Sequence, residues 1–176
     1  MAEPATTGRM RGLDWVLGAL VAAIAPHVLH MPAWVSLVLL AVGAWRWAAD
    51  QRGWPLVPRV LRLVLVAVFA LAILGTYRTL NGIEAGTSFL VLMAAAKLLE
   101  TRAARDLTVV LFIAWFLLYA ALLREQSLPY LPWLLGSAFL TAVALMRVHA
   151  SSAHAPARHI LRRTALLMLQ AAPLAI

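Results

Sequence analysis

The chain has 176 residues, of which 64% are hydrophobic and 12% are charged, and its mean hydropathy is +0.87. A soluble domain of this length is usually about half apolar and about a quarter charged, so the composition excludes an ordinary water-soluble globular protein. The absence of cysteine excludes a disulfide framework, a thiolate zinc site, an iron–sulfur cluster and a cysteine nucleophile within these residues.

Fifteen Lys and Arg residues stand against seven Asp and Glu residues, which gives a formal net charge of +8. In a soluble protein this balance would suggest nucleic acid, but here the cations lie singly or in small groups between long apolar runs. The distribution indicates membrane topology. We therefore expect the lipid bilayer as a partner and no nucleic acid, and the sequence points to no particular protein partner.

Apolar runs of about 20 residues, the length that crosses a hydrocarbon core of about 30 Å, recur along the chain. They predict an all-α polytopic bundle of six full transmembrane spans and a truncated seventh, at about Leu13–Leu29, Pro32–Ala48, Val60–Tyr77, Ile83–Leu99, Leu107–Leu123, Pro129–Met146 and from about Ile160. Residues 1–12 are predicted to form a cytoplasmic tail. The last run reaches Ile176 without a stop signal, so we expect residues 13–176 to be a membrane domain that is incomplete at its carboxyl end.

The cations alternate between the two sides of these spans. Thirteen of the fifteen Lys and Arg residues lie in the tail or after the second, fourth and sixth spans, whereas Arg78 and Arg124 lie on the other side. Because short cytoplasmic segments hold the excess of Lys and Arg, we expect the amino terminus in the cytoplasm. Whatever follows the seventh span is then expected outside the cytoplasm.

Spans four and five have an alternative, because no Gly, Pro or Asn occurs between Thr87 and Leu128. One long bent helix would place the charged segment from Lys97 to Asp106 at bilayer depth, at a cost of about 2.5–3.5 kcal/mol for each charge. A hairpin that turns at residues 101–104 avoids this cost, and we predict the hairpin.

Polar residues gather around the fourth span, and their spacing suggests pairs. Lys97 and Glu100 are three apart, and Arg102 and Asp106 four apart, so that each pair can meet on a helix. This segment is either a solvated cytoplasmic hairpin or a fixed ionic cluster that sets the hairpin geometry or docks a partner. By the same topology, Glu84 and Gln126 are predicted to line an outer vestibule. The candidate site residues, with no role assigned, are Gly82, Glu84, Gly86, Lys97, Glu100, Arg105, Asp106 and Gln126.

Other patterns that carry chemistry elsewhere are incomplete here. His27 and His30 are three apart, but no second buried histidine is predicted to complete a haem or metal site. Gly86-Thr87-Ser88-Phe89 lacks the second glycine of the intramembrane serine protease motif, because Leu90 stands in its place. We therefore expect no catalytic residue, no metal ligand and no cofactor in this chain.

Several short motifs follow one another in a defined order along the chain. They are Arg78-Thr79 with Gly82, Glu84 and Gly86, then Lys97-Leu98-Leu99-Glu100, Arg105-Asp106, Phe116-Leu117 and Gln126-Ser127, and finally Arg162-Arg163 to Gln170-Ala171-Ala172-Pro173-Leu174. These ordered motifs resemble those of one family, the amino-terminal membrane domain of the bacterial TgpA-type transglutaminases. The resemblance implies a multi-pass protein of the bacterial inner membrane. It also implies a large extracytoplasmic transglutaminase-like domain downstream, which would carry a Cys-His-Asp set.

We therefore expect this chain to be the membrane anchor of such an enzyme and to be inert as an enzyme on its own. The alternative, from a different functional class, is a stand-alone small transporter or exporter subunit. That interpretation would require charges or helix breaks near the bilayer midplane and two similar halves.

Overall fold

The structure, a computed structural model, describes residues 10, 12–55, 57–78, 82–124, 127–150 and 157–171. Every regular element in these ranges is helical, so the predicted all-α class is confirmed for the described part of the chain. The α-helices are α1 (Leu13–Ile24), α2 (Ala33–Arg52), α3 (Arg59–Tyr77), α4 (Ile83–Glu100), α5 (Ala104–Arg124), α6 (Leu131–His149) and α7 (Ala157–Ala171). Two short 3₁₀ helices, η1 (Ala25–His27) and η2 (Leu128–Tyr130), precede a turn and α6 respectively.

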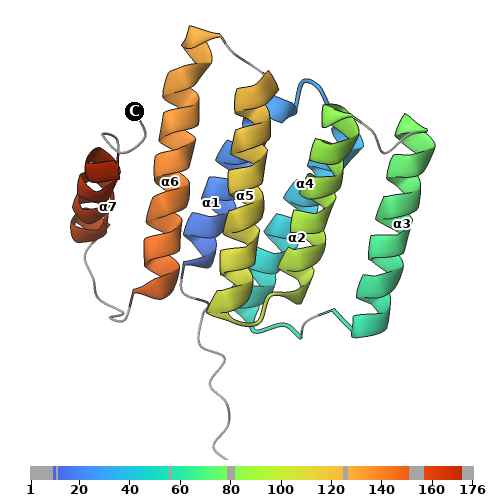
Figure 1. Cartoon of the computed structure of the whole chain (residues 1–176). Helices are drawn as coiled ribbons and strands as arrows, with labels where there is room; N and C mark the ends of the chain where they lie inside the picture. Colours follow the sequence, from blue (N-terminus) through green and yellow to red (C-terminus); the bar gives the residue numbers. More distant parts are fainter. Residues whose placement is uncertain are drawn as a thin grey trace, which may run out of the picture.

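The helices form two layers (Figure 1). Helices α3, α4, α5 and α6 stand side by side in one layer, and α1 and α2 pack behind them. Helix α1 packs against both α5 and α6, and α2 packs against α4. The core between the layers is built from leucine, valine and alanine side chains, among them the fully buried Val16, Leu92 and Leu111.

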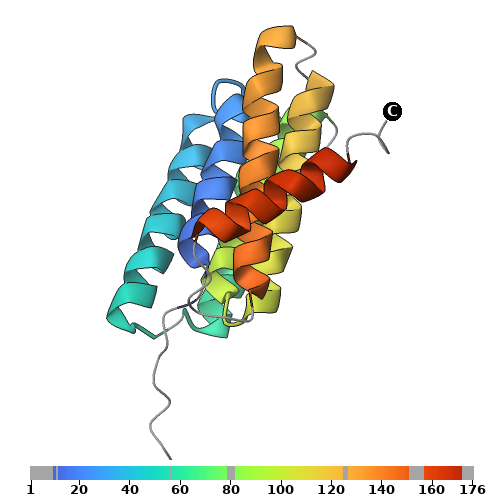
Figure 2. The ribbon, with the colours of Figure 1, turned by 90° about the vertical axis from the view of Figure 1, so that its left-hand side faces the viewer.

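Helix α3 stands at one edge of the bundle, where it packs against α4 (Figure 1). Of its described side chains only that of Ile73 is buried. Helix α7 lies at the other edge, against α6, and Figure 2 shows that it crosses α6 obliquely rather than running along it.

Consecutive helices from α1 to α6 run antiparallel, so the bundle has two distinct ends (Figure 1). We call the end at which α3 and α5 begin and α2, α4 and α6 end the basic end. The described Lys and Arg residues of α1–α6 and their connections lie toward this end, except for Arg78 and Arg124. The alternation of charge along the chain is thus a separation of charge in space.

Helix α4 ends at Glu100 and α5 begins at Ala104, and the two helices pack against each other. The predicted hairpin is confirmed, and the alternative of one long helix is wrong. The turn forms because the carboxylate of Asp106 accepts the backbone N–H groups of Arg102 and Ala103, at 3.0 and 3.2 Å. An acidic side chain at the third helical position satisfies donors that the first turn of a helix leaves free.

The first predicted span is shorter than expected, because α1 ends at Ile24 and continues only as the turn η1. Pro26 lacks the N–H that would bond to the carbonyl of Ala22, four residues back. Donors from α6 reach this carbonyl instead: the indole Nε1–H of Trp133 at 3.2 Å and the hydroxyl of Ser137 at 3.4 Å. The proline therefore both ends α1 and creates the acceptor that ties α1 to α6.

Three segments of the described chain are long and apolar enough to cross a membrane, namely Arg59–Tyr77, Ala104–Arg124 and Leu128–His149. These correspond to the third, fifth and sixth predicted spans. The segment Leu13–His27 is a shorter apolar helix. Helix α2 carries Arg46 and Asp50, α4 carries charges near both of its ends, and the 15-residue α7 carries three arginines.

Candidate functional site

Six charged side chains from four helices lie close together at the basic end of the bundle. Three are cations and three are carboxylates, and they form two groups of ion pairs at 2.9–3.9 Å, which the hydrogen bond from Arg46 to the carbonyl of Thr101 links. We call this group the basic-end cluster, consisting of Arg46 and Asp50 of α2, Arg62 of α3, Lys97 and Glu100 of α4, and Asp106 of α5.

The shortest ion pair of the cluster joins the ends of the α4–α5 hairpin. The Nζ atom of Lys97 lies 2.9 Å from Oδ1 of Asp106, and both side chains are largely buried. The hydrogen bond from Lys97 and that from the backbone of Arg102 lower the pKa of Asp106 from its ordinary 3.8 to about 2. Asp106 precedes the apolar stretch that begins at Leu107, so this group lies outside the predicted span and is ionised at neutral pH.

The predicted ion pair between the side chains of Arg102 and Asp106 is wrong, although the two residues are in contact. Arg102 donates its backbone N–H to Asp106, and the side-chain cation that Asp106 binds is Lys97. The predicted pair between Lys97 and Glu100 is present at 3.9 Å. Glu100 also lies 3.7 Å from Arg62 of α3, which connects the hairpin to the edge helix.

Arg46 connects α2 to the end of α4. Its side chain is buried, and one Nη donates to the backbone carbonyl of Thr101 at 3.1 Å while the other lies 3.8 Å from Asp50. Asp50 in turn accepts the backbone N–H of Met10 at 3.1 and 3.2 Å. These contacts join the start of the described chain, α2 and the end of α4. Loss of any one partner would leave a buried charge unpaired, which is strongly destabilising.

The remaining predicted site residues lie apart from the basic-end cluster. Arg105 is exposed on the first turn of α5 and pairs with no carboxylate among the described residues. At the opposite end, Glu84 of α4 forms a 2.8 Å ion pair with Arg124 of α5. Gly82 is the N-cap of α4, and its carbonyl accepts the N–H of Gly86 at 3.0 Å. Gln126 lies outside the described residues.

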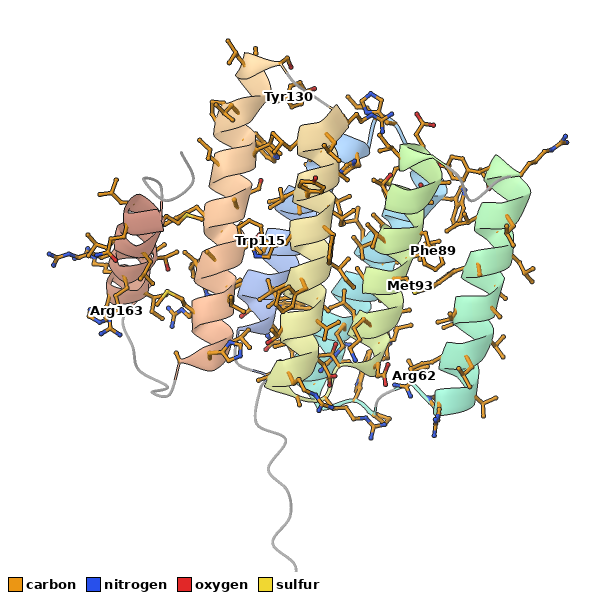
Figure 3. The ribbon with its side chains drawn as sticks, in the orientation of Figure 1. Arg62, Phe89, Met93, Trp115, Tyr130 and Arg163 are labelled. Atoms are coloured by element: carbon orange, nitrogen blue, oxygen red, sulfur yellow. The ribbon has the colours of Figure 1, made fainter. Side chains whose placement is uncertain are left out.

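Three members of the cluster, Arg46, Asp50 and Arg62, were absent from the predicted set. Arg46 and Asp50 are four residues apart, a spacing that favours pairing on a helix and that the sequence offered as a signal. No local pattern relates Arg62 to Glu100, since the two lie on different helices. Figure 3 shows Arg62 at the basic end of the gap between α3 and α4.

The chemistry of the basic-end cluster suits a structural role. Its formal charges cancel, and its members bind one another and backbone groups at helix ends. Among the described residues no group of three or more His, Cys, Asp and Glu side chains is arranged to hold a metal ion. The arrangement is suited to fixing the relative positions of four helices at one end of the bundle.

Comparisons with known proteins agree with the resemblance seen in the sequence motifs. The family model described as the TgpA N-terminal domain matches residues 15–176. A protein-glutamine gamma-glutamyltransferase of Pseudomonas aeruginosa is 29% identical over 170 residues, which cover 92% of this chain and 24% of that protein. The chain thus spans about a quarter of the length of the curated relative that it matches. No solved structure matches the chain significantly.

Proposed function

Because the chain belongs to the TgpA N-terminal domain family, we propose that it is the membrane-anchoring domain of a transglutaminase-like enzyme. The family match is the observation that carries this proposal. The relative from Pseudomonas aeruginosa is named as an enzyme, and this chain corresponds to a quarter of it. The chain contains no cysteine, so the thiol of a transglutaminase-like site would belong to another part of the protein.

In this proposal the bundle crosses the inner membrane six times, and α7 begins a seventh span. Helix α4 supports the higher count, because it lies between α3 and α5 and shares their two ends (Figure 1). Its 18 residues extend about 27 Å at 1.5 Å for each residue, close to the thickness of a hydrocarbon core. The charges of α4 lie near its ends, where they reach the interface.

The basic end faces the cytoplasm in this proposal. Segments rich in Lys and Arg remain on the cytoplasmic side of bacterial membranes, and the two cations at the opposite end, Arg78 and Arg124, are outnumbered. A chain that continues beyond α7 would then enter the extracytoplasmic space. That position suits a downstream transglutaminase-like domain that acts outside the cytoplasm.

Paired reporter fusions test this function. Alkaline phosphatase, which is active only outside the cytoplasm, and green fluorescent protein, which after export by the Sec pathway is dark, are each fused behind Ile176 in a bacterial host. The proposal predicts active phosphatase, dark fluorescent protein and both fusions in the membrane fraction. Matched fusions behind Ala103, in the α4–α5 turn, are predicted to give the reverse pattern. Fluorescent fusions at Ile176, or recovery in the soluble fraction, would contradict the anchoring function.

A further inference from the structure

A groove of about 330 Å³ opens between α3 and α4 at the basic end. Charged residues line one part of it, namely Arg59, Arg62, Lys97 and Glu100. Apolar residues line the other part, namely Leu63, Val66, Met93 and Ala96. Figure 3 shows Met93 and Arg62 along the gap between the two helices.

The charged part and the apolar part of the groove lie one after the other along the axes of α3 and α4. Helix α3 begins at Arg59 and α4 ends at Glu100, so their antiparallel packing brings the charged ends together. Leu63 and Val66 lie about one turn further into α3, and Met93 lies about one turn back along α4. The groove therefore has a charged mouth at the basic end and an apolar continuation toward the middle of the bundle.

The mouth carries surplus positive charge. Three cations line it against the single carboxylate of Glu100, which lies 3.7 Å from Arg62 and 3.9 Å from Lys97. Lys97 is also neutralised by Asp106 at 2.9 Å. Arg59 is exposed and pairs with no carboxylate in the described part of the chain. An anion at the mouth would complete the charge balance.

We propose that this groove binds an anionic phospholipid, with the phosphate at Arg59 and Arg62 and an acyl chain along Leu63, Val66 and Met93. Basic pockets between transmembrane helices on the cytoplasmic side have the chemistry that recognises anionic headgroups. The apolar continuation favours a lipid over a free phosphate, because a free phosphate would leave it empty. This inference rests on the proposed function, since it takes the bundle to lie in the membrane with its basic end at the inner leaflet.

Native mass spectrometry of the purified chain, released from detergent in the presence of defined lipids, tests the proposal. We expect phosphatidylglycerol to bind at least tenfold more tightly than phosphatidylcholine. The double variant R59Q/R62Q is expected to lose most of this preference, because a cation at a membrane surface contributes about fivefold in affinity. The matched control R102Q/R105Q removes two exposed cations at the same end of the bundle, outside the groove, and is expected to keep the preference.

Filling the groove without changing its charge separates the site from general surface attraction. Ala96→Phe places a ring in the apolar lining and is expected to weaken phosphatidylglycerol binding at least tenfold. The control Ala44→Phe fills a separate apolar groove between α1 and α2 and is expected to leave this binding unchanged. If R59Q/R62Q does not fold, R59Q alone serves, because Arg59 takes part in no ion pair with a described residue.

Four results would overturn the proposal: equal affinity for the two lipids, equal losses in the two double variants, unchanged binding in Ala96→Phe, or displacement of the lipid by an equal concentration of inorganic phosphate. A lipid-free dimer that R59Q/R62Q dissociates would assign the groove to a second copy of the chain and would also overturn it. These measurements do not depend on orientation in the cell. Failure of the reporter fusions with intact lipid selectivity would therefore count against the anchoring function alone.

Discussion

Gly82 and Gly86 lie one turn apart at the start of α4, and their backbone conformations differ. Gly82 has φ 124° and ψ 153°, a conformation that is almost restricted to glycine and costs other residues about 1–3 kcal/mol. Gly86 has ordinary helical geometry, and a Cβ atom added there would meet nothing within 4 Å. Although the two glycines belong to the same sequence motif, they therefore have different structural roles.

We predict that Gly82→Ala lowers the free energy of unfolding by about 1–3 kcal/mol because of this backbone strain. Gly86→Ala is expected to raise it by up to about 1 kcal/mol, since alanine is the better helix former. Thermal unfolding of both variants in the same detergent provides the comparison. Equal effects of the two substitutions would contradict the assigned roles.

The ion pair between Lys97 and Asp106 is predicted to be energetically distinct from any pairing of Arg102 with Asp106. In double-mutant cycles with alanine, we expect a coupling of about 1 kcal/mol or more for Lys97 with Asp106, because both side chains are largely buried. The coupling of the Arg102 side chain with Asp106 is expected to be below about 0.3 kcal/mol, because only its backbone contacts the carboxylate. A larger coupling for Arg102 would restore the pairing expected from sequence spacing.

The pKa of Asp106, lowered from 3.8 to about 2, predicts a dependence of stability on pH. A carboxyl group whose pKa is lower in the folded state contributes stability that is fully present above its unfolded pKa and is lost as the pH falls through its folded pKa. The melting temperature of the wild type should therefore exceed that of Asp106→Asn by a constant amount from neutral pH to about pH 4. The difference should shrink between about pH 4 and about pH 2, and a difference that already disappears near neutral pH would contradict the low pKa.

The link between α1 and α6 depends on a proline just beyond the end of α1 and a tryptophan in α6. Pro26 leaves the carbonyl of Ala22 without its helical donor, and Trp133 of α6 donates to it at 3.2 Å. The break at the end of α1 and the packing of α6 are therefore one structural feature. The sequence indicates that Pro26 breaks the helix, but it does not identify the acceptor that the proline exposes.

We predict that Trp133→Phe lowers the free energy of unfolding by about 1 kcal/mol, the net value of a typical hydrogen bond. In the Pro26→Ala background the loss should be less than half as large, because the substituted residue regains a backbone N–H that can bond to the carbonyl of Ala22. Chemical unfolding of the two single variants and the double variant in one detergent measures the difference. Trp115→Phe is the matched control, since the indole of Trp115 on α5 donates to no described residue. Equal losses in both backgrounds would contradict the link.

Across the molecule, the sequence predicted the features that depend on periodic patterns or on residues close together in the chain. The apolar runs predicted the helical class, and the charged segment between Lys97 and Asp106 predicted the hairpin, because charges are costly at bilayer depth. Helix ends were less accurate: α2 continues past Ala48 to Arg52, because Asp50 pairs with Arg46 one turn back and the helix stops only at Gly53, which adopts the left-handed conformation.

The candidate site was predictable only where its members are close in sequence. Lys97, Glu100 and Asp106 share one hairpin, and the sequence located them together. Arg46 and Arg62 reach the same cluster from α2 and α3, and their approach depends on which helices pack side by side. Apolar periodicity does not encode that choice, because the faces of these helices are similarly apolar around most of their circumference.

The proposed anchoring function depends on the basic end facing the cytoplasm. Because the chain contains no cysteine, Ala103→Cys in the α4–α5 turn and Ser127→Cys beside η2 each introduce a single thiol, and both positions are exposed at opposite ends of the bundle.

Labelling of these two variants in spheroplasts with a membrane-impermeant maleimide is the most direct measurement of orientation. We predict that Ser127→Cys reacts at once and that Ala103→Cys reacts only after the membrane is permeabilised. The reverse order of labelling, or equal labelling of both thiols in intact spheroplasts, would contradict the orientation.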